Sequence, residues 1–250
     1  TYPPTKRFDT RDYPTPSYGH GYRLNKAHLP KKFYSWYVCF DYQGGSSMQL
    51  AYSYYYFTAA LTPEQCDTII GMGDTAMEDI VSKGGSTTAG VGEGVNKDRR
   101  DTNISWLDEP ELYGMVQPLI RAANVAADWN FDWDFTEPAQ YTKYGEGQFY
   151  GWHSDSGTAP YPVDAHEKLA GKIRKLSVTV NLSDPDDYEG GNLQFDLGPQ
   201  AGDDRLHTCE EIRPRGSVIV FPSHVQHRVT PVTSGTRRSL VMWSLGLPFR

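Results

Sequence analysis

The chain of 250 residues is 38% hydrophobic, 13% aromatic and 22% charged, which is typical of a soluble globular protein with one large domain or two small ones. Its three cysteines, Cys39, Cys66 and Cys209, are odd in number and far apart, which argues against a disulfide framework and favours a reducing compartment. Its apolar runs are far shorter than the roughly 20 residues that cross a bilayer, so we expect a cytoplasmic protein with no membrane partner.

The net charge of −7 is unevenly distributed, because residues 1–33 carry seven Lys or Arg against two Asp and the rest of the chain is acidic. Residues 1–47 are also rich in Pro, Gly and Tyr, which predicts an irregular basic N-terminal extension, followed by a single domain over residues 48–250. Such an extension could reach nucleic acid or another partner, but basic tails more often stay solvated or lie on their own acidic surface. We therefore do not expect nucleic acid to be the partner.

The first predicted elements are a strand and a helix. The aromatic segment MQLAYSYYYF, residues 48–57, predicts a strand. After it, Thr62 has the position of an N-cap, Pro63 that of the first helical residue, and Gln65 that of the third. This capping-box spacing predicts that a helix begins at Pro63.

A second helix is predicted because Asp108 and Glu111 repeat the capping-box spacing. Between the two helices, residues 82–100 contain few apolar residues and show no period, which predicts a mobile loop or lid. The apolar face of the second helix is expected at Leu112, Val116, Leu119, Ile120 and Ala123.

From about residue 138 the sequence changes to short apolar segments separated by Gly, Pro and Asp, a pattern typical of strands and turns. Such strands after two helices predict a mainly β fold of the α+β class. We expect a double-stranded β-helix, or jelly roll, over residues 138–247, with an N-terminal helical layer. The predicted strands are AQYTKY (139–144), KLSVTVNLS (175–183), GNLQFDL (191–197), GSVIVF (216–221), HRVTPV (227–232) and RRSLVMWSL (237–245).

His153 and Asp155 form a His-x-Asp pair within FYGWHSDSG, residues 149–157. Such a pair arises easily by chance, so a metal site would need a third ligand downstream. His224 and His227 are the candidates. Strand alternation in VQHRVTP places His227 on the apolar face, whereas His224 falls in a predicted turn, so His227 is the better candidate.

Arg237, Ser239 and Val241 share one face of the last predicted strand, which would direct an arginine and a hydroxyl into the barrel. An inward-facing arginine is costly unless an anion meets it. A ligand carboxylate fits the planar guanidinium, and Ser239 would add one hydrogen-bond donor. The alternating polar face from Ser177 to Ser183 could either line such a polar pocket or face solvent.

Three segments follow one another along the chain: KYGEGQFYGWHSDSG (143–157), LSVTVNLSDPDDYEGGNLQF (176–195) and HRVTPVTSGTRRSLVMW (227–243). In this order they resemble the iron(II)- and 2-oxoglutarate-dependent oxygenases and, within them, the prolyl-hydroxylase-like group that includes the PKHD-type hydroxylases. A fourth segment, LTPEQCDTII (61–70), is similar to the helix that precedes the core in this family.

The resemblance implies that His153, Asp155 and His227 are the ligands of iron(II). Two imidazoles and one carboxylate on one face of an octahedral ion leave positions for a chelating 2-oxo acid and for dioxygen. The resemblance further implies that Arg237 and Ser239 bind the distal carboxylate of 2-oxoglutarate.

Three more residues are carried over from the resemblance. Tyr144 and Tyr150 match tyrosines that line the cosubstrate pocket, although each could instead be a core aromatic. Asn181 occupies the position where relatives often have a tyrosine near the distal carboxylate, so its role stays open.

The activity implied is hydroxylation of a prolyl or other residue of a peptide or protein, with oxidative decarboxylation of 2-oxoglutarate to succinate and ascorbate as an accessory reductant. Asp155 implies hydroxylation, since related halogenases lack this carboxylate. The same chemistry on a small molecule or a nucleobase is an alternative, although the second inward arginine of the demethylase pattern is missing. The alternative from another class, an inert metal-binding interaction module, is disfavoured by the intact ligand set and Arg237.

Overall fold

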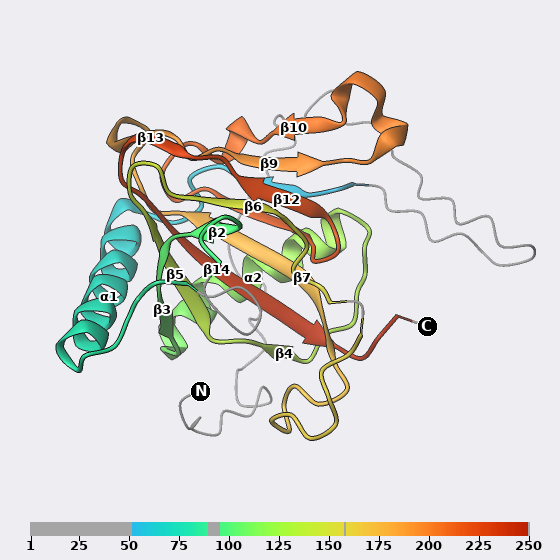
Figure 1. Cartoon of the computed structure of the whole chain (residues 1–250). Coiled ribbons are helices and arrows are strands. Elements are labelled where there is room, and N and C mark those ends of the chain that lie inside the picture. The colour runs from blue at the N-terminus through green and yellow to red at the C-terminus, as the bar shows by residue number, and fades with distance from the viewer. Residues whose placement is uncertain (1–51, 90–95, 158, 250) are drawn as a thin grey trace, which may run out of the picture. The chain divides into compact units, whose positions relative to one another are not determined.

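The computed structural model describes residues 52–89, 96–157 and 159–249 (Figure 1). Within these ranges the chain forms two α-helices, α1 (Pro63–Ser82) and α2 (Pro110–Ala126), three short 3-10 helices, and fourteen strands that pair antiparallel in three sheets. Neither helix is both long and apolar enough to span a membrane. The predicted basic extension, residues 1–47, lies outside the described residues.

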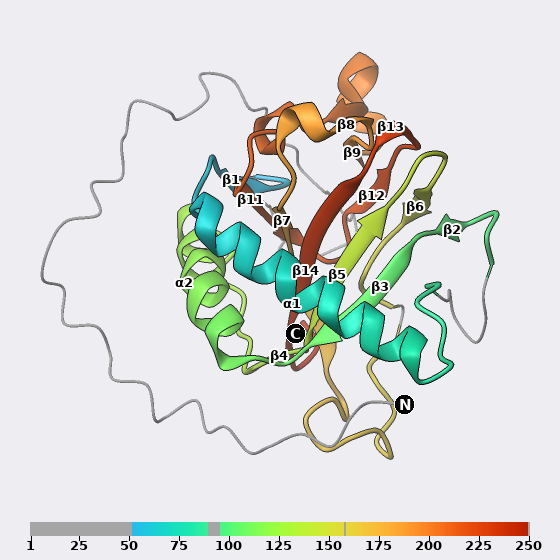
Figure 2. The same ribbon diagram turned by 90° about the vertical axis from the view of Figure 1, so that its left-hand side faces the viewer.

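The larger sheet separates the helices from the rest of the fold. Figure 2 shows both helices on one of its faces, with α1 packed on its β3 edge and α2 on its β1 edge. Its strands run in the order β1 (Tyr55–Phe57), β11 (Val218–Pro222), β7 (Ile173–Asn181), β14 (Arg237–Gly246), β5 (Ala139–Tyr144) and β3 (Asn103–Leu107), and β4 (Phe135–Thr136) pairs with β14.

The smaller sheet faces the side of the larger sheet that the helices leave open (Figure 1). Phe195 and Phe221, one from each sheet, meet edge to face with their ring centres 5.1 Å apart. Two facing antiparallel sheets are the predicted jelly roll. The strands of the smaller sheet are β10 (Leu206–Thr208), β9 (Leu193–Asp196), β12 (Gln226–Val229), β6 (Phe149–His153) and β2 (Arg100–Asp101), and β13 (Val232–Gly235) pairs with β8 (Tyr188–Gly190) outside it.

Side-chain alternation along β14 explains how one strand serves two environments. Leu240 and Met242 are buried among the apolar residues of the two helices. Arg237, Ser239 and Val241, on the opposite face, line a cavity between the two sheets. The parity predicted for these three residues is confirmed, because successive strand residues point to opposite faces.

The start of α1 is confirmed in detail, but that of α2 is not. The Thr62 side chain accepts a hydrogen bond from the backbone of Gln65, whose side chain accepts one from the Thr62 backbone. The predicted Asp108 capping box is wrong, because α2 is capped by Glu109 without a side-chain bond. The Asp108 carboxylate instead accepts a hydrogen bond of 2.6 Å from the hydroxyl of Tyr113.

Two other predicted segments are shorter than expected. Strand β1 covers only Tyr55–Phe57, since residues 52–54 are not in a strand and residues 48–51 are not described. The predicted loop at residues 82–100 ends in regular structure, because Arg100 begins β2. Thr88 also forms an isolated bridge with Asn103.

Helix α1 approaches the larger sheet closely at Gly73. A Cβ atom at this position would lie 2.2 Å from Cγ of Tyr141, whose ring fills the space beside the helix. Two hydrogen bonds maintain the approach: Ser105 Oγ donates to the Gly73 carbonyl at 3.0 Å, and Tyr141 Oη donates to Asp74 at 3.0 Å. The absence of a side chain at Gly73 is therefore a packing requirement.

Replacing Gly73 by alanine should lower the free energy of unfolding by about 1–3 kcal/mol, because the added methyl group overlaps a buried ring. Gly71→Ala is the matched control, since Gly71 lies on the exposed side of α1 with no atom within 4 Å of an added Cβ. This control should raise stability by roughly 0.5–1 kcal/mol through helix propensity. Urea denaturation checks both, and equal stability of the two variants would contradict the packing role of Gly73.

Candidate metal centre

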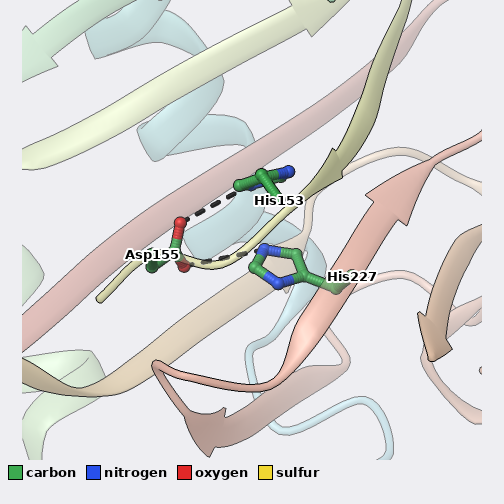
Figure 3. A group of neighbouring side chains, drawn as sticks. All are labelled: His153, Asp155 and His227. Carbon is green, nitrogen blue, oxygen red and sulfur yellow. Dashed lines mark ion pairs between the residues drawn. The ribbon is translucent and has the colours of Figure 1, made fainter. Parts of the chain in front are cut away.

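His153, Asp155 and His227 come together between the two sheets (Figure 3). His153 ends β6 and faces His227 of β12 as its cross-strand partner, while Asp155 follows two residues after His153. Nε2 of His153 is 3.5 Å from Oδ1 of Asp155, and Nε2 of His227 is 3.6 Å from Oδ2. One donor atom from each residue thus lies within 4.8 Å of the others.

Backbone carbonyls orient both imidazoles. Nδ1 of His153 is 2.8 Å from the Gly151 carbonyl, and Nδ1 of His227 is 2.9 Å from the Val225 carbonyl. Because a carbonyl only accepts, each Nδ1 carries a proton, which leaves Nε2 as the nitrogen that faces Asp155 and can bind a metal. Burial lowers the pKa of His227 to about 4, which keeps its imidazole neutral and available as a ligand.

Asp155 is held by donors on the larger sheet and the loop after β11. Ser177 Oγ donates to Oδ2 of Asp155 at 2.7 Å and lies 2.9 Å from Ser223 Oγ. The Asp155 backbone N–H donates to the Ser223 carbonyl at 2.9 Å. Burial alone opposes ionisation, but His227 and His153 outweigh it and keep the pKa of the Asp155 carboxyl below its ordinary value.

The two predicted pocket tyrosines lie in the wall of the cavity that contains His153, Asp155 and His227. The Tyr150 ring stacks on the His153 ring with centres 3.6 Å apart and planes 13° from parallel. Tyr144 is a cross-strand partner of Arg237, whose guanidinium carbon is 5.4 Å from the Tyr144 ring centre. Both tyrosines therefore belong to the cavity as well as to the packing around it.

Arg237 is the deepest cation of this cavity, with 2% of its surface exposed. Its Nη1 donates to Ser239 Oγ at 3.2 Å, but no carboxylate of the described residues forms an ion pair with it. A buried guanidinium without an anion is unfavourable. The geometry therefore leaves room for an external anion beside Arg237 and Ser239.

Asn181 and His224 lie away from the cavity wall. Both amide hydrogens of Asn181 are used by backbone, since Nδ2 donates to the Ser183 carbonyl at 3.1 Å and to the Arg213 carbonyl at 2.8 Å. Asn181 is buried but does not line the cavity, so its role at the cosubstrate stays a prediction. His224 is exposed in the turn before β12, as its position after Pro222 predicted.

Arg174 is a cavity residue that strand alternation does not reveal. The register of β7 against β14 shifts so that Leu245 pairs with Arg174, and Lys175 is passed over. This irregularity turns Arg174 toward the cavity side, where its guanidinium carbon is 3.9 Å from the Trp243 ring centre. Only the register of the folded sheet contains this information.

Glu137 neutralises Arg174 in a fully buried position. The Arg174 Nε donates to Oε1 of Glu137 at 2.9 Å, and its Nη2 donates to Oε2. Tyr161 Oη also donates to Oε1, at 3.2 Å. The Glu137 side chain has no exposed surface, so the carboxylate depends on these donors.

The cavity is richer in cations than the last strand alone indicated, because Arg100 and Arg174 line it together with Arg237. The second inward arginine of the demethylase pattern is missing from this sequence. Other strands nevertheless bring arginines to the same cavity, so the missing position is a weaker argument against a nucleobase substrate than the sequence suggested.

Glu137→Gln should lower the free energy of unfolding by about 3 kcal/mol or more, because it leaves a largely buried Arg174 without its counter-charge. Asp134→Asn is the matched control. Asp134 forms an ion pair with Lys172 but is 63% exposed, so its loss should cost less than about 1 kcal/mol. Chemical denaturation at neutral pH compares the variants, and a similar small loss in both would contradict the buried-pair role.

Comparison with known proteins agrees with this site. Residues 139–245 match the model of the 2OG-Fe(II) oxygenase superfamily. A PKHD-type hydroxylase of Sphingopyxis alaskensis is 32% identical over 173 residues, which cover 66% of this chain and 72% of that protein. The chain belongs to the PKHD-type hydroxylases of this superfamily.

Other relatives are similar over a shorter part. A PKHD-type hydroxylase of Xylella fastidiosa (strain M23) is 35% identical over 108 residues, 43% of this chain and 44% of that protein. The chain thus matches less than half the length of this relative.

Solved structures confirm the jelly-roll fold. A Pseudomonas putida prolyl-4-hydroxylase superposes with a TM-score of 0.56 at 20% identity, over 77% of this chain and 92% of that one. A viral collagen prolyl hydroxylase of Paramecium Bursaria Chlorella virus-1, solved as a 2OG complex, gives 0.55 at 19% identity, over 78% of this chain and 97% of that one. At these identities the likeness concerns the fold alone.

The described residues fit the metal and cosubstrate of this family, which are iron(II) and 2-oxoglutarate. Two imidazole nitrogens and one carboxylate, already oriented toward one another, form a donor set that non-haem iron(II) accepts. The unpaired Arg237 offers a cation for the distal carboxylate of a 2-oxo diacid. Both groups would thus occupy one cavity.

Proposed function

We propose that this protein is an iron(II)- and 2-oxoglutarate-dependent dioxygenase that hydroxylates a prolyl or other residue of a peptide or protein. The observation that carries the proposal is the convergence of His153, Asp155 and His227 in the same cavity as the unpaired Arg237. Neither feature alone requires this chemistry. Together they match an enzyme that needs a metal and an anionic cosubstrate side by side.

Three residues would hold the metal. His153 and His227 would each bind it through Nε2, because their Nδ1 atoms are committed to backbone carbonyls. Asp155 would bind as a carboxylate whose orientation is maintained by Ser177. Iron(II) supplies the activation of dioxygen that couples oxidation of a substrate C–H bond to decarboxylation of 2-oxoglutarate, and ascorbate would keep the iron reduced.

The cosubstrate would be oriented by the residues of β14 and its neighbours. The planar guanidinium of Arg237 would bind the distal carboxylate with two parallel hydrogen bonds, and Ser239 would add a hydroxyl donor. Tyr144 lies beside this arginine, and Tyr150 covers one face of the His153 imidazole. These rings exclude water from the two groups that must stay in fixed orientation.

A peptide substrate is supported by one structural neighbour in particular. A prolyl hydroxylase from Trichoplax adhaerens, solved in complex with a hypoxia inducible factor peptide fragment, has a TM-score of 0.54 and 18% identity to this chain. A small molecule or a nucleobase is the alternative substrate. The three arginines that line the cavity would favour such a substrate if it carried a negative charge. We also propose a cytoplasmic location, since Cys66 and Cys209 are free thiols.

The ligand assignment can be tested at the two histidines that compete for the third position. His227→Ala should abolish stoichiometric iron(II) binding, because it removes a buried donor that faces Asp155. His224→Ala should bind iron normally, since His224 is exposed in a turn three residues away. Anaerobic iron titration measures both, and retention of iron by the His227 variant with loss in the His224 variant would reverse the assignment.

The proposed activity can be tested before the substrate is known. The iron(II)-loaded protein should slowly convert 2-oxoglutarate to succinate with ascorbate present, and N-oxalylglycine should block this reaction. Arg237→Lys should weaken 2-oxoglutarate binding by about 1–3 kcal/mol, because the charge is kept while the planar fork is lost. Succinate is followed by mass spectrometry and affinity by anaerobic calorimetry. Absence of both turnover and 2-oxoglutarate affinity would favour the inert metal-binding module.

A further inference from the structure

Arg100 is a second buried arginine of the cavity, and no carboxylate of the described residues forms an ion pair with it. It begins β2 and exposes only 6% of its surface. Its guanidinium lines the same cavity as the metal ligands. Among the residues that the structure describes, none accepts a hydrogen bond from this side chain, and its Nε is buried without a partner. Like Arg237, it forms no ion pair with a carboxylate of the described residues, whereas Arg174 is neutralised by Glu137.

Strand register fixes the place of Arg100 relative to the metal ligands. Arg100 is the cross-strand partner of Tyr150, and its guanidinium carbon lies 4.4 Å from the centre of the Tyr150 ring. Tyr150 in turn stacks on His153 at 3.6 Å. The backbone of Gly151 also donates to the Arg99 carbonyl at 2.8 Å, which keeps the two strands together. The guanidinium is thus held one aromatic ring away from a metal ligand.

The contact with Tyr150 does not by itself explain a buried cation. A cation–π contact offsets only part of the cost of removing a charge from water. A methionine or leucine at position 100 could cover the same ring without that cost. The unsatisfied donors of Arg100 therefore point to a ligand that the protein receives from outside.

The charges in the cavity indicate the charge of the ligand that Arg100 would bind. This step rests on the proposed function, because it counts iron(II) and 2-oxoglutarate as bound. Asp155 is the one carboxylate among the residues that line the cavity, and Glu137 already pairs with Arg174. With iron(II) and the 2-oxoglutarate dianion bound, the charges of the metal, the cosubstrate, Asp155 and Arg237 cancel. Among the described residues that line the cavity, Arg100 would then be the one charged group left uncompensated, which favours a ligand with a single negative charge.

We propose that Arg100 binds a carboxylate of the substrate, so that the substrate class is a peptide or amino-acid derivative with a free carboxylate near the oxidised carbon. The flat guanidinium can take both carboxylate oxygens. The stack on Tyr150 and His153 sets the distance between this carboxylate and the metal ligands. The carboxylate belongs either to the end of a main chain or to an acidic side chain.

Two matched pairs of probes separate these sources and isolate the charge. N-acetylproline and N-acetylprolinamide differ in a main-chain carboxylate. N-acetylaspartate and N-acetylasparagine, each with its main-chain carboxyl group amidated, differ in a side-chain carboxylate. Each probe is titrated into zinc(II)-loaded protein saturated with 2-oxoglutarate, and dissociation constants are measured by NMR for the wild type, Arg100→Met, Arg100→Lys and Arg99→Met. Arg99 is the matched control because it is the exposed neighbour of Arg100.

We expect at least one acid to bind about 10-fold or more tightly than its neutral partner, as a charge-assisted pair in a buried site should. Arg100→Met should abolish this preference, Arg100→Lys should keep part of it, and Arg99→Met should keep all of it. Equal binding of acids and amides by the wild type, or a preference that survives in Arg100→Met, would overturn the proposal.

The affinity for 2-oxoglutarate, measured first in each variant, separates the remaining explanations. If Arg100→Met weakens 2-oxoglutarate binding about 10-fold or more, Arg100 serves the cosubstrate and the proposal is wrong. If the wild type itself does not bind 2-oxoglutarate, the proposed function fails and the inference that rests on it fails with it. If the wild type binds 2-oxoglutarate normally but shows no preference for acids, the proposed role of Arg100 is wrong while the proposed function stands.

Discussion

Side-chain alternation along the strands of the larger sheet is the constraint on which the site depends, because each strand must satisfy two unlike environments. On one face, Leu240 and Met242 pack with the helices. On the other, Ser239 and Arg237 face a cavity between the sheets. The helical layer thus covers one face of the sheet with apolar packing, and the open face can carry polar groups that a closed apolar core would not accept.

The distribution of charge in the cavity follows from the cost of burial. A buried charged group that has a protein partner is stable without a ligand, whereas one that lacks a partner is suited to bind a ligand of opposite charge. Arg174 is satisfied by Glu137, and Asp155 by Ser177 and the two histidines. Among the described residues, Arg237 has the Ser239 hydroxyl and the Tyr144 ring beside it but no carboxylate. A cavity in which some cations are neutralised and others are not can bind an anion at the positions of the cations that are not neutralised.

Most of the fold, and the convergence of His153, Asp155 and His227, follow from sequence patterns, and the errors have local causes. Side-chain alternation was sufficient to place His227, rather than His224, and Arg237 on the cavity side, because His227 and Arg237 lie in regular strands. It failed at Arg174, where the register of β7 shifts. It could not find Arg100 either, because a two-residue strand at the end of an aperiodic segment shows no pattern. The start of α2 was misplaced because the Asp108 carboxylate binds Tyr113 rather than the helix backbone.

Glu137 has a consequence for the segment between β6 and β7, because one of its oxygens accepts hydrogen bonds both from Arg174 in the cavity wall and from Tyr161 in that segment. Tyr161 is also fastened to the base of the segment by backbone hydrogen bonds with Lys172 and Gly171. Residues that share one acceptor do not act independently, so substitutions at positions 161 and 174 will be non-additive. Natural variation at the two positions should therefore be correlated, and neither can be exchanged freely while the other is kept.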